Sequence, residues 1–274
     1  MNTNKITFWG VRGSHPTPEK SKMKFGGETS CVEIRTAQNE LIILDMGTGI
    51  RNLGKKLLQE NSTFTNCNIF LSHTHWDHIQ GIMSCNQFYS ESCQFTIHYG
   101  KTKAPSLQKL FERILDFQLW PISLNMLENI TFLNHKEKQY KISENIRVNT
   151  NLHDHPNGAF GYRFDIGNVS IAYVTDCEHH PGEPNQNVVD FVKNADLLIH
   201  DAHFTPKDLQ NSQGWGHSSW KEAVMVAKQA NVKQLALFHY SPDYDDATIE
   251  QIGKDAKKEF PNTILSKVGL TIEI

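Results

Sequence analysis

The stretch Asn68-Ile-Phe-Leu-Ser-His73-Thr-His75-Trp-Asp77-His78 places three imidazoles and one carboxylate within six residues, directly after an apolar run. The apolar residues predict a short buried strand, so the polar cluster falls where that strand ends. The chain turns there, and alternate side chains no longer have to point to opposite faces of a sheet. These side chains can therefore turn inward around a metal ion, whereas a solvated histidine-rich loop would not need such ordered spacing. Their N and O donors suit Zn²⁺, Mn²⁺ or Fe²⁺.

Length and composition limit the classes of protein that this chain can represent. It has 274 residues and no Pro-, Gly- or Ser-rich linker, so we expect a single domain over residues 1–274. The formal net charge of −3 gives no general electrostatic reason to hold a long polyanion, and no extended nucleic acid is expected as a partner. Five cysteines without CxxC spacing favour the reducing cytoplasm. No run of about 18 apolar residues predicts a membrane span.

Strand-like and helix-like segments are mixed along the whole chain, which predicts an α/β fold of layered sheets flanked by helices. The expected strands are Lys5–Trp9, Cys31–Arg35, Leu41–Leu44, Asn68–Leu71, Gln94–His98, Ile146–Thr150, Gly161–Asp165, Val169–Thr175, Leu197–Ile199, Gln234–Phe238 and Gly269–Ile274. The expected helices are Ser106–Phe117, Asn187–Lys193, Ser218–Ala230 and Ala247–Lys258. Asp176, Asp201 and His239 stand at the ends of three separate strands, which one shared site explains more easily than three coincidences.

The His-x-His-x-Asp-His pattern after an apolar strand resembles the signature of the metallo-β-lactamase fold superfamily. The segment around Asp45 resembles the strand and Asp-x-Gly loop that precede this signature, and Asp45 is either a turn residue or a support for a metal ligand. His155 resembles the third ligand of the branch that contains tRNA 3′-processing endonucleases and cyclic-nucleotide phosphodiesterases, with His153 as a nearby competitor. The resemblance implies a four-layer αββα sandwich with mixed sheets.

The resemblance also implies two divalent metal ions, with Zn²⁺ expected and Mn²⁺ or Fe²⁺ as alternatives. Residue by residue, it places His73, His75 and His155 on one ion, Asp77, His78 and His239 on the other, and Asp176 on both. Two dications close together repel each other, so they need an anionic oxygen bridge, which an aspartate and a hydroxide can provide.

Two further clusters resemble motifs of the phosphodiesterase branch. Asp201-Ala-His-Phe resembles its acidic motif, and Gly214-Trp-Gly-His217-Ser-Ser resembles its His-Ser-Thr-type motif. The resemblance implies that His217, oriented by Asp201, lies near the scissile phosphate, where a histidine can protonate a leaving alkoxide or hold a phosphoryl oxygen. The plainer alternative is that the serines after His217 cap a helix, and both can hold. Asp77 is expected to serve catalysis as well as metal binding, and Trp76 and Trp215 are either base-stacking or ordinary core aromatics.

The function expected from these residues is hydrolysis of a 3′,5′-cyclic nucleotide, such as cAMP or cGMP, to a 5′-monophosphate by a metal-bridging hydroxide. His155 and Asp176 are only 21 positions apart, which leaves no room for the long arm that tRNA endonucleases usually insert there. The alternative is a tRNA 3′-processing endonuclease-like enzyme or another small-phosphodiester hydrolase. Hydrolysis of lactones, thioesters or β-lactams is less favoured, and a non-catalytic metal-binding module is least favoured. By resemblance we also expect a homodimer.

Overall fold

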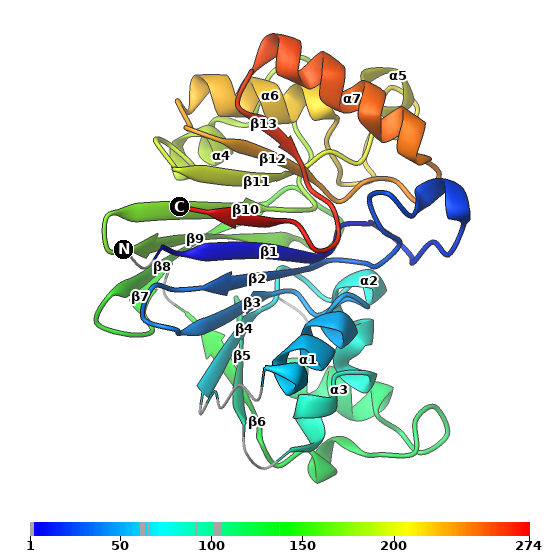
Figure 1. The fold of residues 1–274 in the computed structure, drawn as a ribbon, viewed down its shortest axis with the longest axis vertical. Helices are drawn as coiled ribbons and strands as arrows, with labels where there is room; N and C mark the ends of the chain where they lie inside the picture. Colours follow the sequence, from blue (N-terminus) through cyan, green and yellow to red (C-terminus); the bar gives the residue numbers. More distant parts are fainter. Residues whose placement is uncertain (1–2, 61–63, 65, 91–92, 101–105, 137) are drawn as a thin grey trace.

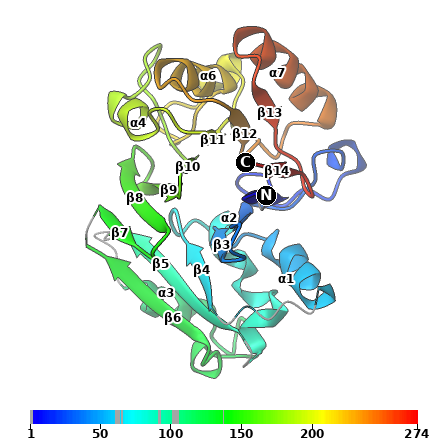
Figure 2. The same cartoon turned by 60° about the vertical axis from the view of Figure 1, so that its left-hand side comes forward.

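Two seven-stranded sheets face each other, and helices cover their outer sides (Figure 1). The computed structural model describes residues 3–60, 64, 66–90, 93–100, 106–136 and 138–274. Seen from another side, α4, α6 and α7 lie over one sheet, and α1 and α3 lie against the other (Figure 2). The expected four-layer arrangement of mixed sheets between helices is therefore confirmed.

The first sheet has the order β14-β1-β2-β3-β4-β5-β6. Its strands are β1 (Lys5–Gly10), β2 (Cys31–Arg35), β3 (Leu41–Leu44), β4 (Asn66–Phe70), β5 (Gln94–Gly100), β6 (Ile130–His135) and β14 (Thr271–Glu273). The strands from β3 to β6 pair in parallel, whereas β14, β1, β2 and β3 pair antiparallel. Helices α1 (Ile50–Gln59) and α3 (Leu107–Ile114) bury Leu53 and Phe111 in a core with Ile69 and Phe95.

The second sheet has the order β13-β12-β11-β10-β9-β8-β7. Its strands are β7 (Gln139–Lys141), β8 (Ile146–His153), β9 (Ala159–Ile166), β10 (Val169–Val174), β11 (Leu197–Asp201), β12 (Leu235–Phe238) and β13 (Thr263–Leu265). Strands β10 to β13 run parallel, and β7 to β10 pair antiparallel. The α-helices of this half are α4 (Gln186–Phe191), α5 (Pro206–Leu209), α6 (Trp220–Gln229) and α7 (Asp246–Glu259).

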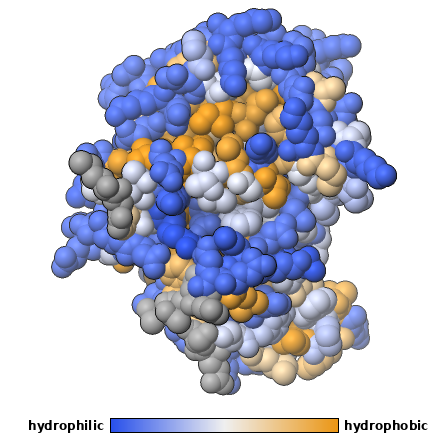
Figure 3. All heavy atoms as spheres, viewed as in Figure 1, coloured by the Kyte–Doolittle hydropathy of each residue, from blue (hydrophilic) through white to orange (hydrophobic). Residues whose placement is uncertain are grey.

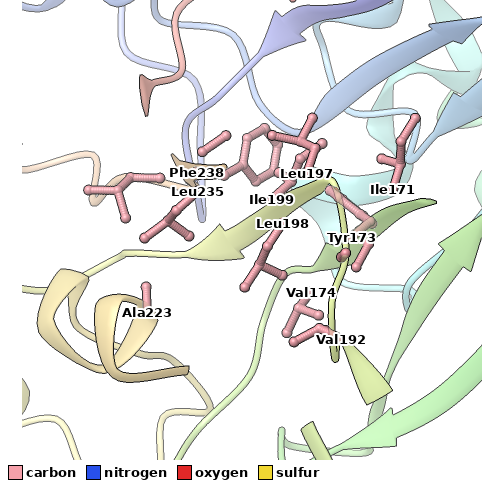
Figure 4. Close-up of a cluster of buried hydrophobic side chains, with 14 of the residues drawn as sticks. Ile171, Tyr173, Val174, Val192, Leu197, Leu198, Ile199, Ala223, Leu235 and Phe238 are labelled. Carbon is pink, nitrogen blue, oxygen red and sulfur yellow. The ribbon is translucent and has the colours of Figure 1, made fainter. Parts of the chain in front are cut away.

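The larger core lies between the sheets and continues under α6 and α7. Phe8 and Phe70 of the first sheet meet Phe164 and Tyr173 of the second in one buried cluster. Figure 4 shows its centre, where side chains of β10, β11 and β12 gather beside Ala223 of α6. Every residue of β11 and β12 is buried, since both faces of these strands are covered, which explains the apolar runs Leu197–Ile199 and Leu235–Phe238. On the face in Figure 3, hydrophilic residues cover most of the surface around a smaller apolar centre.

The observed elements match most sequence-based expectations, with shifted ends. The helix expected at Ser106–Phe117 is confined to α3, and the strand expected at Gly269–Ile274 is reduced to β14. The elements that were not expected include α1, α2 (Trp76–Ile79), α5, β6, β7 and β13. Within the described residues, no helix is long and apolar enough to cross a membrane.

Candidate metal centre and active site

The candidate site forms where strands of both sheets end. Strand β4 leads into the His73 loop, and the parallel neighbours β10, β11 and β12 bring Asp176, Asp201 and His239 to one edge of the second sheet. The carboxyl ends of adjacent parallel strands are the usual place for a binding site in an α/β sheet. Asp45, Asp176 and His239 have φ values of 56°, 52° and 63°. This left-handed conformation costs a residue other than glycine about 1–3 kcal/mol and is concentrated at functional sites.

The first group of donors consists of His73, His75 and His155. Nδ1 of His75 lies 3.0 Å from Nε2 of His155, and the ring of His73 lies 4.4 Å and 4.6 Å from those two rings. Burial lowers the pKa of all three imidazoles below the usual value, and the other histidines of the site add to this effect. The three rings are therefore neutral near pH 7, which is the form that binds a metal ion.

The second group consists of Asp77, His78 and His239. Oδ2 of Asp77 lies 3.2 Å from Nε2 of His78 and 3.1 Å from Nε2 of His239, and those two nitrogens are 3.1 Å apart. The backbone N–H of Ser14 donates to the same Asp77 oxygen at 2.8 Å and fixes the carboxylate from across the site. These atoms could hold one cation among them.

Asp176 lies between the two groups and presents one carboxylate oxygen to each. Its Oδ1 lies 3.8 Å from Nε2 of His73 and 3.7 Å from Nε2 of His155. Its Oδ2 lies 3.2 Å from Nε2 of His78 and 3.4 Å from Nε2 of His239. This division of the two oxygens is the arrangement that a carboxylate shared by two metal ions requires.

Hydrogen bonds on the outer side of the rings turn the other ring nitrogens toward the centre of the site. Nδ1 of His78 donates to Asp45 at 2.8 Å, so a neutral His78 turns the lone pair of Nε2 toward carboxylate oxygens. Nδ1 of His155 donates to the carbonyl of Gly216 at 2.8 Å, so a neutral His155 carries its lone pair on Nε2, which faces Nδ1 of His75. Nε2 of His73 is buried and has no hydrogen-bond partner in the described part of the chain. Converging acceptors of this kind fit a cation.

Charge favours a cation at the same place. Burial lowers the pKa of His78, but Asp176, Asp77 and Asp45 outweigh this and raise it well above the usual value. The pKa of Asp77 is lowered, since the attraction of His78 and His239 exceeds the effect of burial. The carboxylates thus draw positive charge to the position where the second group converges, and a divalent metal ion would supply it.

Asp45 fits both of its expected roles. It is a turn residue with positive φ, and it also supports a metal-ligand candidate. Its Oδ1 accepts from the backbone N–H of Ser72 at 2.8 Å, and its Oδ2 accepts from the Ser72 hydroxyl, His78 Nδ1 and the Tyr173 hydroxyl, each at 2.8 Å. Ser72 and Tyr173 were not expected at the site, although Ser72 directly precedes the histidine motif.

His217 and Asp201 are paired as the sequence led us to expect. Nδ1 of His217 donates to Oδ2 of Asp201 at 2.9 Å, and the backbone N–H of His203 donates to Oδ1 of Asp201 at 2.8 Å. Burial lowers the pKa of His217, but the Asp201 carboxylate outweighs it and raises this pKa to about 9. Ser219 caps α6 in a capping box with Glu222, so the plainer role expected for the serines holds as well.

His153, His179 and His200 are among the histidines that lie outside the two groups. His153, the competitor of His155, is buried beside Gly161, where any Cβ would collide with its ring. His179 Nδ1 accepts from the backbone N–H of Asn185 at 3.1 Å, and His200 Nδ1 donates to the carbonyl of Asp201 at 2.8 Å. These contacts fix the tautomers, so the 3.3 Å contact between the two Nε2 atoms is a hydrogen bond from His179 to His200. This pair needs no metal ion.

A small pocket adjoins the first group of donors. It has a volume of about 150 Å³, and its lining includes His73, His75, Tyr99, Arg113 and Phe160. Its size is below the roughly 300–1,000 Å³ of pockets that enclose a drug-sized ligand, so it suits one ring system of a larger molecule.

The chain resembles known proteins over nearly its whole length. Residues 42–240 match the family model described as Beta-lactamase superfamily domain. The ribonuclease Z of Thermoplasma acidophilum is 26% identical over 322 residues, which cover 98% of this chain and 96% of that protein. The metallo-beta-lactamase fold protein YhfI from Bacillus subtilis has a TM-score of 0.76 at 20% identity, with complete coverage of both chains. Human tRNase Z, short form, has a TM-score of 0.67 at 21% identity, with 98% of each chain covered.

These relatives correct one expectation. The prediction that no extended nucleic acid would be a partner is wrong, because proteins that align with 98% of this chain are named ribonuclease Z. The net charge on which it rested is an average over the whole chain and does not restrict a local contact surface. The short interval from His155 to Asp176 excludes a long inserted arm between these two residues, and it does not exclude a contact surface for RNA elsewhere in the chain.

The expected enzyme class is confirmed, since relatives in sequence that align with 98% of the chain are named ribonuclease Z and the fold carries clusters of His and Asp that could hold metal ions. The chain is a metal-dependent phosphodiester hydrolase of the phosphodiesterase and nuclease branch. With its motif, its two sheets and the match over residues 42–240, this chain belongs to the beta-lactamase superfamily and has the metallo-β-lactamase fold.

Proposed function

We propose that this chain is a dinuclear-metal phosphodiesterase that cleaves RNA, in the manner of the ribonuclease Z proteins that it resembles. The observation that carries the two-metal chemistry is the placement of Asp176, with one oxygen toward each group of donors. The alignment with ribonuclease Z over 98% of the chain supports RNA as the substrate class. Kinship of fold alone would also allow lactones or thioesters, and nothing at the site favours them.

In this proposal, His73, His75 and His155 hold one ion, Asp77, His78 and His239 hold the other, and Asp176 holds both. The all-N/O donor set makes Zn²⁺ the expected ion and accepts Mn²⁺ or Fe²⁺. Bound ions would supply positive charge to the phosphoryl oxygens and make a water molecule more acidic. The protein's own part is to hold these donors neutral or anionic and correctly turned, as the hydrogen bonds to Asp45 and Gly216 do.

His217 is the proposed proton donor. The raised pKa keeps it protonated near neutral pH, and Asp201 fixes its ring through Nδ1. A positioned imidazolium can protonate the ribose oxygen that leaves when the phosphodiester is cut. Asp77 contributes through His239 and His78, because it contacts both rings.

The surroundings of the site supply aromatic surface for bases. Phe160 and Tyr99 line the pocket beside the first group, and Trp76 and Trp215 are 49% and 62% exposed in segments that carry site residues. Stacking of a base on an aromatic side chain contributes about 1–3 kcal/mol without reading sequence. An RNA strand can therefore be held beside the donors by base stacking, and no basic stripe is needed.

A panel of substrates tests this function. Purified protein, loaded with Zn²⁺ or with Mn²⁺, is incubated with tRNA precursors that carry a 3′ extension, unstructured RNA, 3′,5′-cyclic nucleotides and bis(p-nitrophenyl) phosphate. We expect cleavage of RNA and of the nitrophenyl diester, and none by Asp176→Asn. Hydrolysis of cyclic nucleotides with RNA left intact would reject RNA as the substrate, and failure on all phosphodiesters would reject the class.

The second candidate substrate is a small cyclic nucleotide. One observation favours it: only the β9–β10 hairpin joins the His155 loop to Asp176, so no arm projects there. The alignment with the Thermoplasma acidophilum protein spans 322 positions, more than the 274 residues of this chain, so that relative has segments that this chain lacks. The same panel separates the two substrates.

A further inference from the structure

Glu178 joins three loops that surround the site. It lies two residues after Asp176, in the loop that follows β10. Its Oε1 accepts from the backbone N–H of Gly214 at 2.6 Å, and its Oε2 accepts from the backbone N–H of Gly216 at 2.7 Å. Its own backbone N–H donates to the carbonyl of Asp154 at 2.9 Å, next to His155. One residue thus connects the Asp176 loop, the His155 loop and the loop before His217.

Gly216, whose backbone N–H donates to Glu178, also carries the carbonyl that sets the tautomer of His155. The carbonyl of Gly216 accepts from Nδ1 of His155 at 2.8 Å, which leaves the lone pair of Nε2 for the first group of donors. Gly214 and Gly216 both have φ of 84°, and a Cβ at Gly216 would collide with the His155 ring. The backbone there follows a path that glycine permits but does not itself enforce. Something else must hold this path, and the carboxylate of Glu178 binds both glycine amides.

The carboxylate of Glu178 is used to bind the backbone amides of Gly214 and Gly216. Among the described residues, its carboxylate forms no ion pair with a lysine or arginine, so both oxygens are given to the two amides. Hydrogen bonds from N–H groups to a carboxylate are stronger than those between neutral groups. Glu178 is half-buried and belongs to neither of the two groups of donors described above.

We propose that Glu178 is a positioning residue of the metal centre, which acts through the loop of residues 214–217. It fixes the Gly216 carbonyl that orients His155, and it fixes the backbone from which His217 reaches Asp201. The consequences for metal binding and for the proton donor rest on the proposed function. In metal-binding proteins, groups that orient a ligand typically change metal affinity or activity by 10–100-fold when they are replaced.

The test compares Glu178→Gln with the matched control Glu183→Gln, which makes the same change in charge at an exposed position of the same loop. Glutamine keeps the size of the side chain but turns an NH₂ group toward one of the two glycine amides. Zn²⁺ affinity is measured on metal-free protein by competition with a chelating dye. We expect Glu178→Gln to weaken the first or second Zn²⁺ by about 10–100-fold, and Glu183→Gln to match the wild type.

Three further measurements separate positioning from a general loss of structure. We expect the amides of Gly214 and Gly216 to exchange hydrogen faster in Glu178→Gln, kcat to fall with KM little changed, and Glu178→Asp to recover only part of the affinity. A lower Tm with unchanged Zn²⁺ affinity and unchanged amide exchange would overturn the proposal. Unchanged affinity in a variant that cleaves RNA normally would overturn it and leave the proposed function standing. A wild-type protein that binds Zn²⁺ but cuts no RNA would reject the function only, and one that binds no Zn²⁺ would reject both.

Discussion

Replacement of Asp201 by asparagine should move the loss of activity at alkaline pH to a much lower pH. In the wild type, the Asp201 carboxylate lies 2.9 Å from Nδ1 of His217 and raises the pKa of this histidine to about 9. Asparagine can keep the hydrogen bond through its side-chain oxygen but carries no charge. Burial then opposes only the weaker attraction of Asp176 and Asp77, and we expect the pKa of His217 to fall to about its usual value of 6.5.

The size of the effect follows from these two values. The difference between about 9 and 6.5 corresponds to about 3 kcal/mol between the protonated and neutral forms, at 1.36 kcal/mol for each pH unit. At pH 8, roughly nine-tenths of the wild-type His217 is protonated, against about 3% in the variant. If His217 donates the proton, the rate at pH 8 falls about 30-fold, whereas at pH 6 it changes by less than about twofold.

The assay uses two substrates that differ in their need for an acid. RNA releases a ribose alkoxide, which must be protonated, and bis(p-nitrophenyl) phosphate releases a stable phenolate, which needs no proton. We therefore expect the 30-fold loss at pH 8 with RNA and only a small loss with the nitrophenyl diester. His217→Asn serves as the reference variant, since it should show no alkaline limb that depends on this residue.

Two results would refute the reasoning. Identical pH profiles for the wild type and Asp201→Asn would mean that the carboxylate does not control the protonation of His217. An equal loss with both substrates would mean that His217 holds a phosphoryl oxygen and does not protonate the leaving group.

Other changes test the centre and its surroundings. Asp176→Asn should reduce bound Zn²⁺ from two ions per chain to one or fewer in native mass spectrometry, and two retained ions would contradict the shared ligand. Asp45→Ala removes the acceptor of four buried hydrogen bonds, so the free energy of unfolding in urea should fall by about 3–5 kcal/mol; a loss below about 1 kcal/mol would contradict this. Metal-free protein should lose stability as the pH falls below 6.5, because the folded state keeps four histidines neutral while the unfolded chain protonates them. These four histidines are His98, His153, His179 and His203, and burial is the largest cause that lowers the pKa of each to about 3. Each should contribute a slope of about 1.4 kcal/mol per pH unit between pH 6.5 and 3, and urea midpoints that do not change between pH 7.5 and 5 would contradict it.

The sequence predicts the centre of this molecule better than its outer parts. The motif from His73 to His78 is local, so its residues and the strand before it can be read together. Helix α1 was missed although Ile50, Leu53 and Leu57 are buried on one face, because Gly54 interrupts it and no side chain caps its start. A Cβ at Gly54 would lie 2.6 Å from Oε1 of Gln87, so a larger residue there would have to displace that side chain. Strand β6 was missed because its residues are only partly buried, and little of its sequence is continuously apolar.

Contacts between loops that are far apart in the sequence limit how much of the site can be predicted. The pairing of His217 with Asp201 could be expected from two motifs, but the bond from the Ser14 amide to Asp77 joins residues 63 positions apart. Glu178 likewise has no local signal, since its partners lie 36 and 38 positions away. Every residue except proline has a backbone N–H, so the sequence does not show which amide a side chain binds. Such contacts are found only in the structure.

We expect metal binding and folding to be coupled in this protein by its own electrostatics. Asp77, Asp176 and Asp45 are buried beside imidazoles, and ring nitrogens of each group lie close to one another and to these carboxylates. Three residues at the same place also hold a left-handed backbone, which costs free energy in any state that contains the site. A bound cation would reduce the electrostatic cost of burying the carboxylates and imidazoles together. It would do so in the folded state only, because the unfolded chain cannot bring both groups together. Chelation should therefore lower Tm as well as activity, and Asp176→Asn should reduce the difference between the metal-bound and metal-free Tm.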